Sequence, residues 1–192
     1  MITADGPADP NALDARRIQW RRDLLALRAN MAVAARAEAE RSIAVALTSQ
    51  LADFEGVLGF YWPIQHEFDA RPAVTNWLAA SSHRRAVLPV VVKRAAPLKF
   101  RQWTTTTAMQ SAGFGTSIPA SGQWMDPDAL LVPLVGFDDQ LYRLGYGGGY
   151  YDRTLAALSR RPDTTGIGFK ICRLKSIEPQ SHDLKLDRLI IG

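Results

Sequence analysis

The segment 130–153, LLVPLVGFDDQLYRLGYGGGYYDR, limits the possible folds of this chain more than any other part. It opens with the apolar run Leu130–Val135, which is typical of a buried strand. A glycine loop is expected at Leu144–Gly149, with Gly145 and Gly147–Gly149, and Tyr150–Ser159 favours a helix. A buried strand joined to a helix by a glycine loop is a unit of α/β folds, in which helices cover a mostly parallel sheet.

The composition of this loop favours a phosphate-binding site. Glycines allow backbone N–H groups to approach a phosphate closely, and the N-terminus of the following helix adds a partial positive charge. Arg143 lies just before the loop and carries a planar fork of donors suited to phosphate oxygens. Asp152 lies just after the loop, where a carboxylate could hold Mg²⁺ between phosphates. Together these residues predict a nucleotide-phosphate site.

Two common phosphate-binding motifs do not match this loop. The P-loop requires Lys followed by Ser or Thr after its last glycine, whereas Tyr150 and Tyr151 follow here. The dinucleotide-binding motif requires a glycine at the position of Tyr150. The loop could instead be a structural turn with stacked tyrosines and an aspartate that caps the helix. We favour the phosphate site, because four glycines in five positions cost more backbone entropy than a turn requires.

The rest of the chain alternates between expected helices and strands. After a polar segment Met1–Asp9, Pro10 suits the first position of a helix that reaches about Asn30. Further helices are expected at Ala32–Leu51 and Pro72–Ala80, strands at Val57–Tyr61, Ala86–Val92, Leu98–Trp103, Thr165–Lys170 and Arg188–Ile191, and a loop at Gly113–Asp128. This pattern predicts a layered α/β fold with a mostly parallel sheet flanked by helices. We expect a flexible N-terminal tail over residues 1–10 and a single domain over residues 11–192.

Composition excludes several classes of protein. Cys172 is the only cysteine, which excludes a disulfide framework and a cysteine-rich zinc site and suits a reducing compartment. The three histidines, His66, His83 and His182, lack the spacing of a zinc protease. Apolar runs such as Ala86–Val92 are too short to cross a membrane, and Met1–Pro10 lacks the apolar core of a secretory signal. We therefore expect a cytoplasmic protein with no membrane partner.

The charge balance favours a small anionic ligand over a nucleic acid. The 23 Lys and Arg residues against 19 Asp and Glu give a net charge of +4, which favours a nucleotide or a polycarboxylate. The sequence has no dense basic tract and no RNA-binding motif, so we expect no nucleic-acid partner. We expect a monomer or a weak homodimer.

The sequence RLGYGGGYYDR after an apolar strand resembles the signature of the 5-formyltetrahydrofolate cyclo-ligase family, also called methenyltetrahydrofolate synthetases. Other segments match the family in chain order: a basic helix with Arg17, Arg21 and Arg28; YWPIQHEFD from Tyr61 to Asp69; central strands with Leu88-Pro89 and Leu98–Phe100; and His182-Asp183 before the last strand. The resemblance covers about Arg17 to Gly192. The glycine segment is its specific part, and the other segments gain weight from their order.

The resemblance implies an ATP-dependent ring closure that requires Mg²⁺. The family converts 5-formyltetrahydrofolate to 5,10-methenyltetrahydrofolate, while ATP becomes ADP and phosphate. Transfer of the γ-phosphate to the formyl oxygen turns a poor leaving group into a good one, and the second folate nitrogen then attacks the activated carbon. The family's fold is similar to that of sugar-phosphate isomerases and CoA transferases.

The resemblance also assigns roles to individual residues. Arg143 and Tyr151 are implied to be catalytic, and Asp152 and Asp183 to hold Mg²⁺. ATP binding is implied for Arg17, Arg21, Arg143, Leu144, Gly145, Tyr146, Gly147, Gly148, Gly149, Tyr150 and Tyr151. Substrate binding is implied for Trp62, Glu67, Tyr146, Gly147, Gly148, Gly149 and Tyr150. The Glu67 carboxylate would accept paired hydrogen bonds from the pterin ring.

Several of these residues have plainer explanations. Arg17 and Arg21 are read from the residues alone as a solvated basic helix face. Trp62 suits core packing about as well as a wall of the folate pocket. His66 beside Glu67 is better explained as an exposed loop histidine than as a base.

The chain departs from the family pattern at five positions. Tyr146 and Gly148 are uncharged where many members carry a basic residue, which shifts phosphate binding toward Arg143 and the backbone. Ile118, Leu141 and Arg173 replace a common glutamate, glycine and glutamine, which we expect to affect substrate positioning rather than the class of reaction.

Two other functions stay open from the sequence. One is another ATP- or phosphosugar-dependent enzyme on the same fold, and the other is a non-catalytic folate or nucleotide sensor. Glu67 with its aromatic neighbours argues against the first, because a sugar-phosphate site does not need them. Arg143 with Asp152 and Asp183 argues against the second, because a pure binding protein has less need of two metal-binding carboxylates.

Overall fold

A six-stranded sheet forms the centre of the protein, of which this computed structural model describes residues 10–192. The strands are β1 (Val57–Gly59), β2 (Arg85–Val90), β3 (Lys99–Trp103), β6 (Ala129–Pro133), β9 (Asp163–Gly168) and β10 (Arg188–Ile191). They lie in the order β10-β9-β6-β1-β2-β3, and the β2–β3 pair at one edge is antiparallel while the other pairs are parallel. The mostly parallel sheet predicted from the sequence is confirmed.

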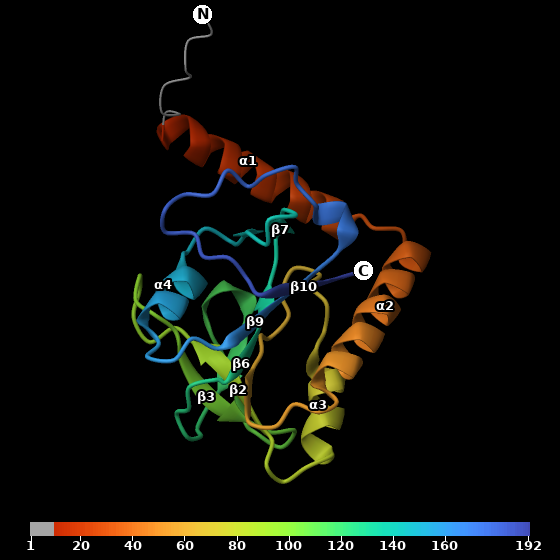
Figure 1. Cartoon of the computed structure of the whole chain (residues 1–192), viewed down its shortest axis with the longest axis vertical. Helices are drawn as coiled ribbons and strands as arrows, with labels where there is room; N and C mark the ends of the chain where they lie inside the picture. The colour runs from red at the N-terminus through yellow and green to blue at the C-terminus, as the bar shows by residue number, and fades with distance from the viewer. Residues whose placement is uncertain (1–9) are drawn as a thin grey trace, which may run out of the picture.

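The α-helices of residues 10–192 are α1 (Pro10–Ala29), α2 (Val33–Leu51), α3 (Arg71–Ala79) and α4 (Tyr150–Ala157). In Figure 1, α2 and α3 lie to one side of the sheet, α4 lies to the other, and α1 crosses one end. Helix α1 begins at Pro10 as predicted, whereas the expected polar tail Met1–Asp9 lies outside the described residues. None of these helices combines the length and apolar character needed to span a bilayer.

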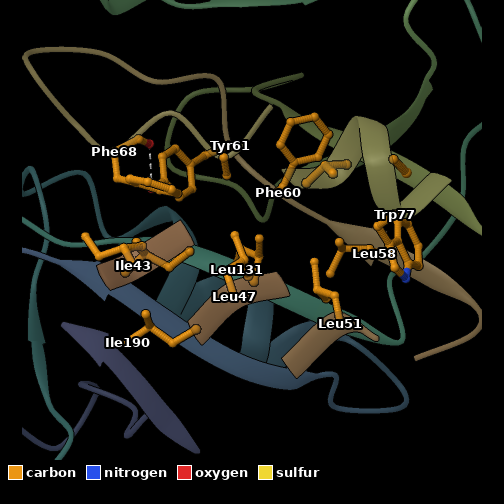
Figure 2. Packing of buried hydrophobic residues seen from close by; sticks show 14 of the residues in the cluster. Ile43, Leu47, Leu51, Leu58, Phe60, Tyr61, Phe68, Trp77, Leu131 and Ile190 are labelled. Atoms are coloured by element: carbon orange, nitrogen blue, oxygen red, sulfur yellow. Dashed lines mark hydrogen bonds between the residues drawn. The ribbon is translucent and has the colours of Figure 1, made fainter. Parts of the chain in front are cut away.

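The alternation of side chains along the strands builds a core on each face of the sheet. In β6, Leu131 packs on the face covered by α2, whereas Leu130 and Val132 pack on the opposite face. On the first face, Ile43, Leu47 and Leu51 recur every fourth residue of α2 and meet the strand side chains (Figure 2). Each such buried side chain contributes about 1.5–3 kcal/mol. The position of α2 therefore follows from its apolar stripe.

Several short elements were not expected from the sequence. The pairs β4 (Met109–Ser111) with β5 (Ser117–Pro119) and β7 (Gly136–Phe137) with β8 (Arg143–Leu144) are antiparallel, and 3₁₀ turns lie at Gly113–Gly115 and Lys170–Cys172. The expectation of a loop throughout Gly113–Asp128 is therefore wrong, and Leu144 belongs to β8 rather than to the glycine loop. Strand β9 begins and ends two residues before the expected strand. Elements of two or three residues are too short for a hydrophobic period to reveal.

The β7–β8 turn joins the carboxyl end of β6 to the glycine loop. The Asp138 carboxylate accepts hydrogen bonds from the N–H groups of Gln140 at 3.0 Å, Tyr142 at 3.1 Å and Ile177 at 3.0 Å. Between them, Leu141 has a φ of +70°, a left-handed conformation that favours glycine. Glycine is the usual residue at this position in the family that the sequence resembles. The structure gives the reason, because the turn requires a positive φ there.

Substitutions of Leu141 separate this backbone strain from side-chain packing. We expect Leu141→Val to lower the free energy of unfolding by about 1–3 kcal/mol, because a β-branched residue is least compatible with the left-handed region. Leu141→Gly removes more side chain but relieves the strain, so it should be more stable than the valine variant. Chemical denaturation measures both. A valine variant at least as stable as the glycine variant would contradict this explanation.

Candidate active site

A cavity of about 620 Å³ lies where the segments following β1, β2 and β6 meet the glycine loop. Parallel strands place their carboxyl ends at one edge of the sheet, which is where ligands bind in open α/β folds. Every residue with an implied role lines this cavity: Arg17, Arg21, Trp62, Glu67, Arg143, Leu144, Gly145, Tyr146, Gly147, Gly148, Gly149, Tyr150, Tyr151, Asp152 and Asp183. The fold therefore brings together residues from four separate parts of the chain.

The conformation of the glycine loop depends on two of its glycines. Gly147 and Gly149 have φ values of +92° and +62°. A Cβ atom at Gly147 would lie 3.3 Å from Cζ of Arg21, and one at Gly149 would lie 2.7 Å from Nη1 of Arg153. The loop backbone thus lies against two guanidinium groups, in a conformation that side chains at these positions would oppose.

Two arginines hold the loop by its carbonyl groups. Nε of Arg21 donates to the carbonyl oxygen of Gly145 at 2.8 Å, and Nη2 of Arg153 donates to that of Gly148 at 2.6 Å. Helix α4 starts directly after Gly149 without a side-chain cap. The alternative in which Asp152 caps this helix is therefore wrong. An uncapped helix N-terminus at a cavity suits an anion.

Arg17 and Asp183 form a paired contact at one side of the cavity. Nη2 of Arg17 donates to Oδ2 of Asp183 at 2.6 Å, and Nη1 lies 3.5 Å from Oδ1. Burial opposes ionisation of Asp183, but hydrogen bonds from Arg17 and from the N–H of Gln180 outweigh burial and lower its pKa. Asp183 is therefore ionised at neutral pH. The reading of Arg17 as part of a solvated face is wrong, because its side chain is only 7% exposed.

A second pair joins Arg143 and Asp152, whose Nη2 and Oδ1 atoms are 2.8 Å apart. The backbone of Leu184 contacts both side chains: its carbonyl accepts from Nη1 of Arg143 at 3.0 Å, and its N–H donates to Asp152 at 3.1 Å. The contact between Arg143 and Asp152 is not aligned as a hydrogen bond, so Nη2 of this buried arginine has no hydrogen-bond partner among the described residues. A buried donor at a cavity wall suits a bound anion.

The two aspartates fit a magnesium site completed by a substrate. Asp152 accepts a hydrogen bond from the residue next to Asp183, so both carboxylates lie at the same end of the cavity. Within residues 10–192 there is no group of three or more His, Cys, Asp and Glu side chains that could enclose a metal ion. Mg²⁺ is usually held by one or two carboxylates together with substrate phosphates and water. The donor set matches that pattern.

Arg21 has donors that the protein leaves open. Its Nε is bound to Gly145, but neither Nη atom makes a hydrogen bond or an ion pair within the described residues. Burial and the neighbouring charge of Arg17 lower its pKa, yet a guanidinium stays protonated at neutral pH. Arg21 is therefore the cation best placed to receive an anion from solution.

A tight turn after β1 presents Glu67 to the other end of the cavity. Gln65 and His66 have φ values of +45° and +62°, which are unfavourable for residues other than glycine. The turn is closed by the N–H of Glu67, which donates to the carbonyl of Ile64 at 2.9 Å. The hydroxyl of Tyr61 donates to the carbonyl of Phe68 at 3.0 Å (Figure 2). These contacts fix the carboxylate of Glu67 in a strained but well-defined place.

Arg28 of α1 supports this turn from beneath. It is 1% exposed and donates to the carbonyls of Gln65 at 3.1 Å and Leu134 at 2.7 Å and to the hydroxyl of Tyr146 at 2.8 Å. The Tyr146 hydroxyl in turn donates to Oε1 of Glu67 at 2.6 Å. A buried arginine thus joins the turn, the end of β6 and the glycine loop.

Burial controls the ionisation of the groups at this end. It raises the pKa of Glu67, although hydrogen bonds from Tyr146 and from the N–H of Ile64 oppose the effect. Burial and the charge of Glu67 also raise the pKa values of Tyr146 and Tyr151, so both phenols stay protonated at neutral pH. The implied catalytic Tyr151 lies beside Arg143, whose Cζ is 5.9 Å from the ring centre. Tyr151 can donate a hydrogen bond but does not act as an anion.

Trp62 and His66 lie near each other in the sequence but in different surroundings. Trp62 lines the cavity and also packs against the core, so both readings of this residue hold in part. The Arg71 guanidinium lies 4.4 Å from the centre of the Trp62 ring and is itself paired with Asp69 at 2.7 Å. His66 is exposed and does not line the cavity, as expected.

Sequence reasoning gave no separate role to Arg28 or Tyr61. The signal for Arg28 was its spacing, because Arg17, Leu24 and Arg28 recur at helical intervals and are all buried. Other lining residues had been given no role from the sequence, although some lie in segments that match the family: Ile64, Gln65, Pro89, Val91, Leu98, Thr116, Pro133 and His182.

The departures from the family pattern fall in different places. Tyr146 and Gly148 line the cavity, whereas Ile118, Leu141 and Arg173 are not among its lining residues. Ile118 pairs with Gln110 in the β4–β5 ribbon, and Arg173 forms an ion pair with Asp139 at 2.7 Å. Two of the five departures therefore lie in the wall of the cavity.

Comparison with known proteins agrees with this geometry. A model of the 5-formyltetrahydrofolate cyclo-ligase family matches residues 14–192. The chain belongs to this family. A 5-formyltetrahydrofolate cyclo-ligase of Haemophilus influenzae is 25% identical over 185 residues, covering 92% of this chain and 98% of the relative. A second cyclo-ligase, of Mycoplasma pneumoniae, is 41% identical over a shorter match of 33% of this chain and 38% of that relative.

Solved structures share the fold. A 5,10-methenyltetrahydrofolate synthetase of Mycoplasma pneumoniae has a TM-score of 0.73 at 24% identity, over 91% of this chain and 97% of the other. One of Aquifex aeolicus has a TM-score of 0.73 at 23% identity, over 91% and 89%. The expected α/β fold and the expectation that the chain is an enzyme of the cyclo-ligase family are confirmed. The roles of individual residues stay predictions.

Arg28 should stabilise the fold of the site through its hydrogen bonds. We expect Arg28→Leu to lower the free energy of unfolding by about 1–3 kcal/mol or more, because it leaves the buried carbonyls of Gln65 and Leu134 without a donor. The matched control is Arg22→Leu, at an exposed arginine of the same helix, which should change stability by less than about 0.5 kcal/mol. Equal effects of the two substitutions in chemical denaturation would contradict this role.

Proposed function

We propose that this chain cyclises 5-formyltetrahydrofolate to 5,10-methenyltetrahydrofolate, with consumption of ATP and a requirement for Mg²⁺. The observation that carries the proposal is a single cavity with two chemically different ends. One end has three arginines, two carboxylates and an uncapped helix N-terminus, which suit a metal-bound triphosphate. The other end has a buried carboxylate and aromatic side chains, which suit a flat ring with N–H donors.

The chemistry explains why both ends share one cavity. The formyl oxygen attacks the γ-phosphorus of ATP, the bond to the bridging oxygen breaks, and ADP leaves. The second folate nitrogen then attacks the formyl carbon, phosphate departs with the former formyl oxygen, and the nitrogen loses its proton. The protein contributes mainly by alignment of the two substrates and neutralisation of phosphate charge.

The arginines would bind the triphosphate. Arg21 offers its open Nη donors, and Arg143 offers a buried donor that no acceptor among residues 10–192 satisfies. Arg17 is held against Asp183, and its guanidinium lies on the same side of the cavity. The backbone N–H groups of Gly147–Gly149 would complete the phosphate cradle. Tyr151 would donate a hydrogen bond to the oxygen that receives or loses the phosphoryl group.

Asp152 and Asp183 would hold the magnesium ion together with ATP oxygens. The ion would supply neutralisation of the charge that develops on the transferred phosphoryl group. Both carboxylates are paired with arginines, which balance their negative charge. The aspartates keep the arginines extended toward the phosphates.

Glu67 would bind the pterin ring by accepting its N–H donors, with Trp62 and Tyr61 as walls. This arrangement favours a folate over a sugar phosphate, because a sugar phosphate does not require a buried carboxylate between aromatic side chains. The pairing of two carboxylates with phosphate-binding arginines favours catalysis over sensing. We place the reaction in the cytoplasm, in agreement with a single buried cysteine, Cys172.

The activity itself is tested by the absorbance of methenyltetrahydrofolate. Purified protein with 5-formyltetrahydrofolate, Mg²⁺ and ATP should form product, and omission of ATP should abolish it. Asp152→Asn should lower kcat/KM by at least about 100-fold, because it removes one metal-binding charge while keeping an acceptor for Leu184. Asp139→Asn, at an exposed aspartate outside the cavity, is the matched control. ATP-independent product, or full activity of Asp152→Asn, would refute the proposed roles.

The affinity for folate should depend on the ionisation of Glu67. Burial raises the pKa of Glu67, so protonation begins at a higher pH than for an exposed glutamate and removes an acceptor for the pterin. Affinity for 5-formyltetrahydrofolate should therefore fall as pH decreases through this raised pKa, by up to about tenfold per pH unit below it. Glu67→Gln should bind more weakly and lose this dependence, whereas Glu40→Gln, outside the cavity, should retain it. Calorimetric titration between pH 5 and 8 distinguishes these outcomes.

A further inference from the structure

The buried charges Arg28 and Glu67 meet through a third side chain. Glu67 is 9% exposed, and its carboxylate accepts from the N–H of Ile64 at 2.9 Å and from the hydroxyl of Tyr146 at 2.6 Å. Arg28 has no carboxylate within ion-pair distance in the described residues, and it donates to the same Tyr146 hydroxyl at 2.8 Å. One phenol therefore accepts from the cation and donates to the anion.

Tyr146 also belongs to the glycine loop. Its neighbour Gly145 is held by Nε of Arg21 at 2.8 Å, and its other neighbour Gly147 lies against the guanidinium of the same arginine. The backbone of Tyr146 is therefore attached to the end of the cavity that suits phosphates, while its hydroxyl is attached to the end that suits the pterin. No other side chain of the glycine loop makes a hydrogen bond to the Glu67 turn within the described residues.

The hydroxyl of Tyr146 takes one of the lone-pair sites on an oxygen of Glu67 that a ring ligand would also use. A carboxylate that accepts paired N–H donors uses both of its oxygens. Oε2 of Glu67 is already bound to its own turn, and Oε1 is bound to Tyr146. Because Glu67 is almost fully buried, little of its surface is left for a ligand while Tyr146 stays in place. In this arrangement the Tyr146 hydroxyl competes with a pterin for Oε1 of Glu67.

A triphosphate would act on the glycine loop, to which the backbone of Tyr146 belongs. Its charge would compete for Arg21 with the carbonyl of Gly145, and its oxygens would bind the loop N–H groups. Either change displaces the backbone on both sides of Tyr146. The loop can respond because Gly145 and Gly147 add no Cβ atom beside it, and Tyr146 is partly exposed.

We propose that Tyr146 is a latch that couples the two halves of the cavity: its hydroxyl blocks Glu67 until a nucleotide on the glycine loop draws it away. This inference rests on the proposed function. It makes nucleotide and folate binding cooperative, and linkage requires that each ligand raise the affinity for the other by the same factor. It also gives the reaction an order, in which the phosphoryl donor is in place before the folate is bound tightly. Tyr146 is a positioning residue in this account, since it acts through Glu67.

The test measures the affinity for 5-formyltetrahydrofolate with and without a non-hydrolysable ATP analogue and Mg²⁺. In the wild-type protein the analogue should raise this affinity by about 5- to 150-fold. In Tyr146→Phe, affinity without the analogue should rise at least about fivefold, because nothing occupies Oε1, and the analogue should change it by less than about twofold. Tyr142→Phe removes a hydroxyl outside the cavity and should keep the wild-type ratio.

A purely structural role of Tyr146 predicts the opposite sign. In that case the Tyr146→Phe variant would bind folate more weakly than the wild type, both with and without the analogue. The ratio of the two affinities would be unchanged, and this result would overturn the latch. Binding of neither ligand to the wild-type protein would overturn the proposed function and the latch together. Binding of both ligands with the same ratio in wild type and variant would overturn the latch alone.

A second measurement does not depend on removal of the hydroxyl. With 3-fluorotyrosine at position 146, the ¹⁹F resonance reports the surroundings of the ring. The analogue with Mg²⁺ should shift this resonance in the absence of folate. A resonance that the analogue leaves unchanged, under conditions where calorimetry shows it bound, would also overturn the latch.

Discussion

The hydrogen bonds of the Arg28 guanidinium fix the positions of the two ends of the cavity. The guanidinium is buried at the carboxyl end of the sheet and binds three oxygens from three segments: the turn after β1, the residue after β6 and the glycine loop. A buried cation must have its donors satisfied, because each unpaired donor costs about 1–3 kcal/mol. The same requirement therefore fixes α1 across the end of the sheet and holds two segments that line the cavity at a set separation.

The electrostatics of the cavity follow from pairing inside a partly buried space. Arg17 with Asp183 and Arg143 with Asp152 form two pairs in which one partner suits a phosphate and the other suits a metal ion. Each pair is neutral, so neither the buried Arg17 nor the buried Arg143 is left as an uncompensated charge. A metal-bound triphosphate brings both charges at once and can satisfy both partners. The open donors of Arg21 provide the initial attraction.

The sequence contained enough to predict the layers of the fold and the members of the site. The apolar run at Leu130, the alternation of helices and strands, and the glycine loop can all be recognised from local sequence patterns, and the structure confirms them. The residues to which the family resemblance assigned roles all line one cavity. Local pattern did not predict the short β4–β5 and β7–β8 pairs, because two or three residues carry no measurable period. Nor did it predict the link from Arg28 through Tyr146 to Glu67, since hydrogen bonds between residues 79 to 118 positions apart depend on the fold.

The central claim is that ATP activates the formyl oxygen of the folate inside this cavity. The most direct measurement uses 5-formyltetrahydrofolate labelled with ¹⁸O in the formyl group and follows the label by mass spectrometry of the released phosphate. If the formyl oxygen attacks the γ-phosphorus, the inorganic phosphate will carry one ¹⁸O atom for each turnover. Product formation with the label in water and none in phosphate would contradict the account.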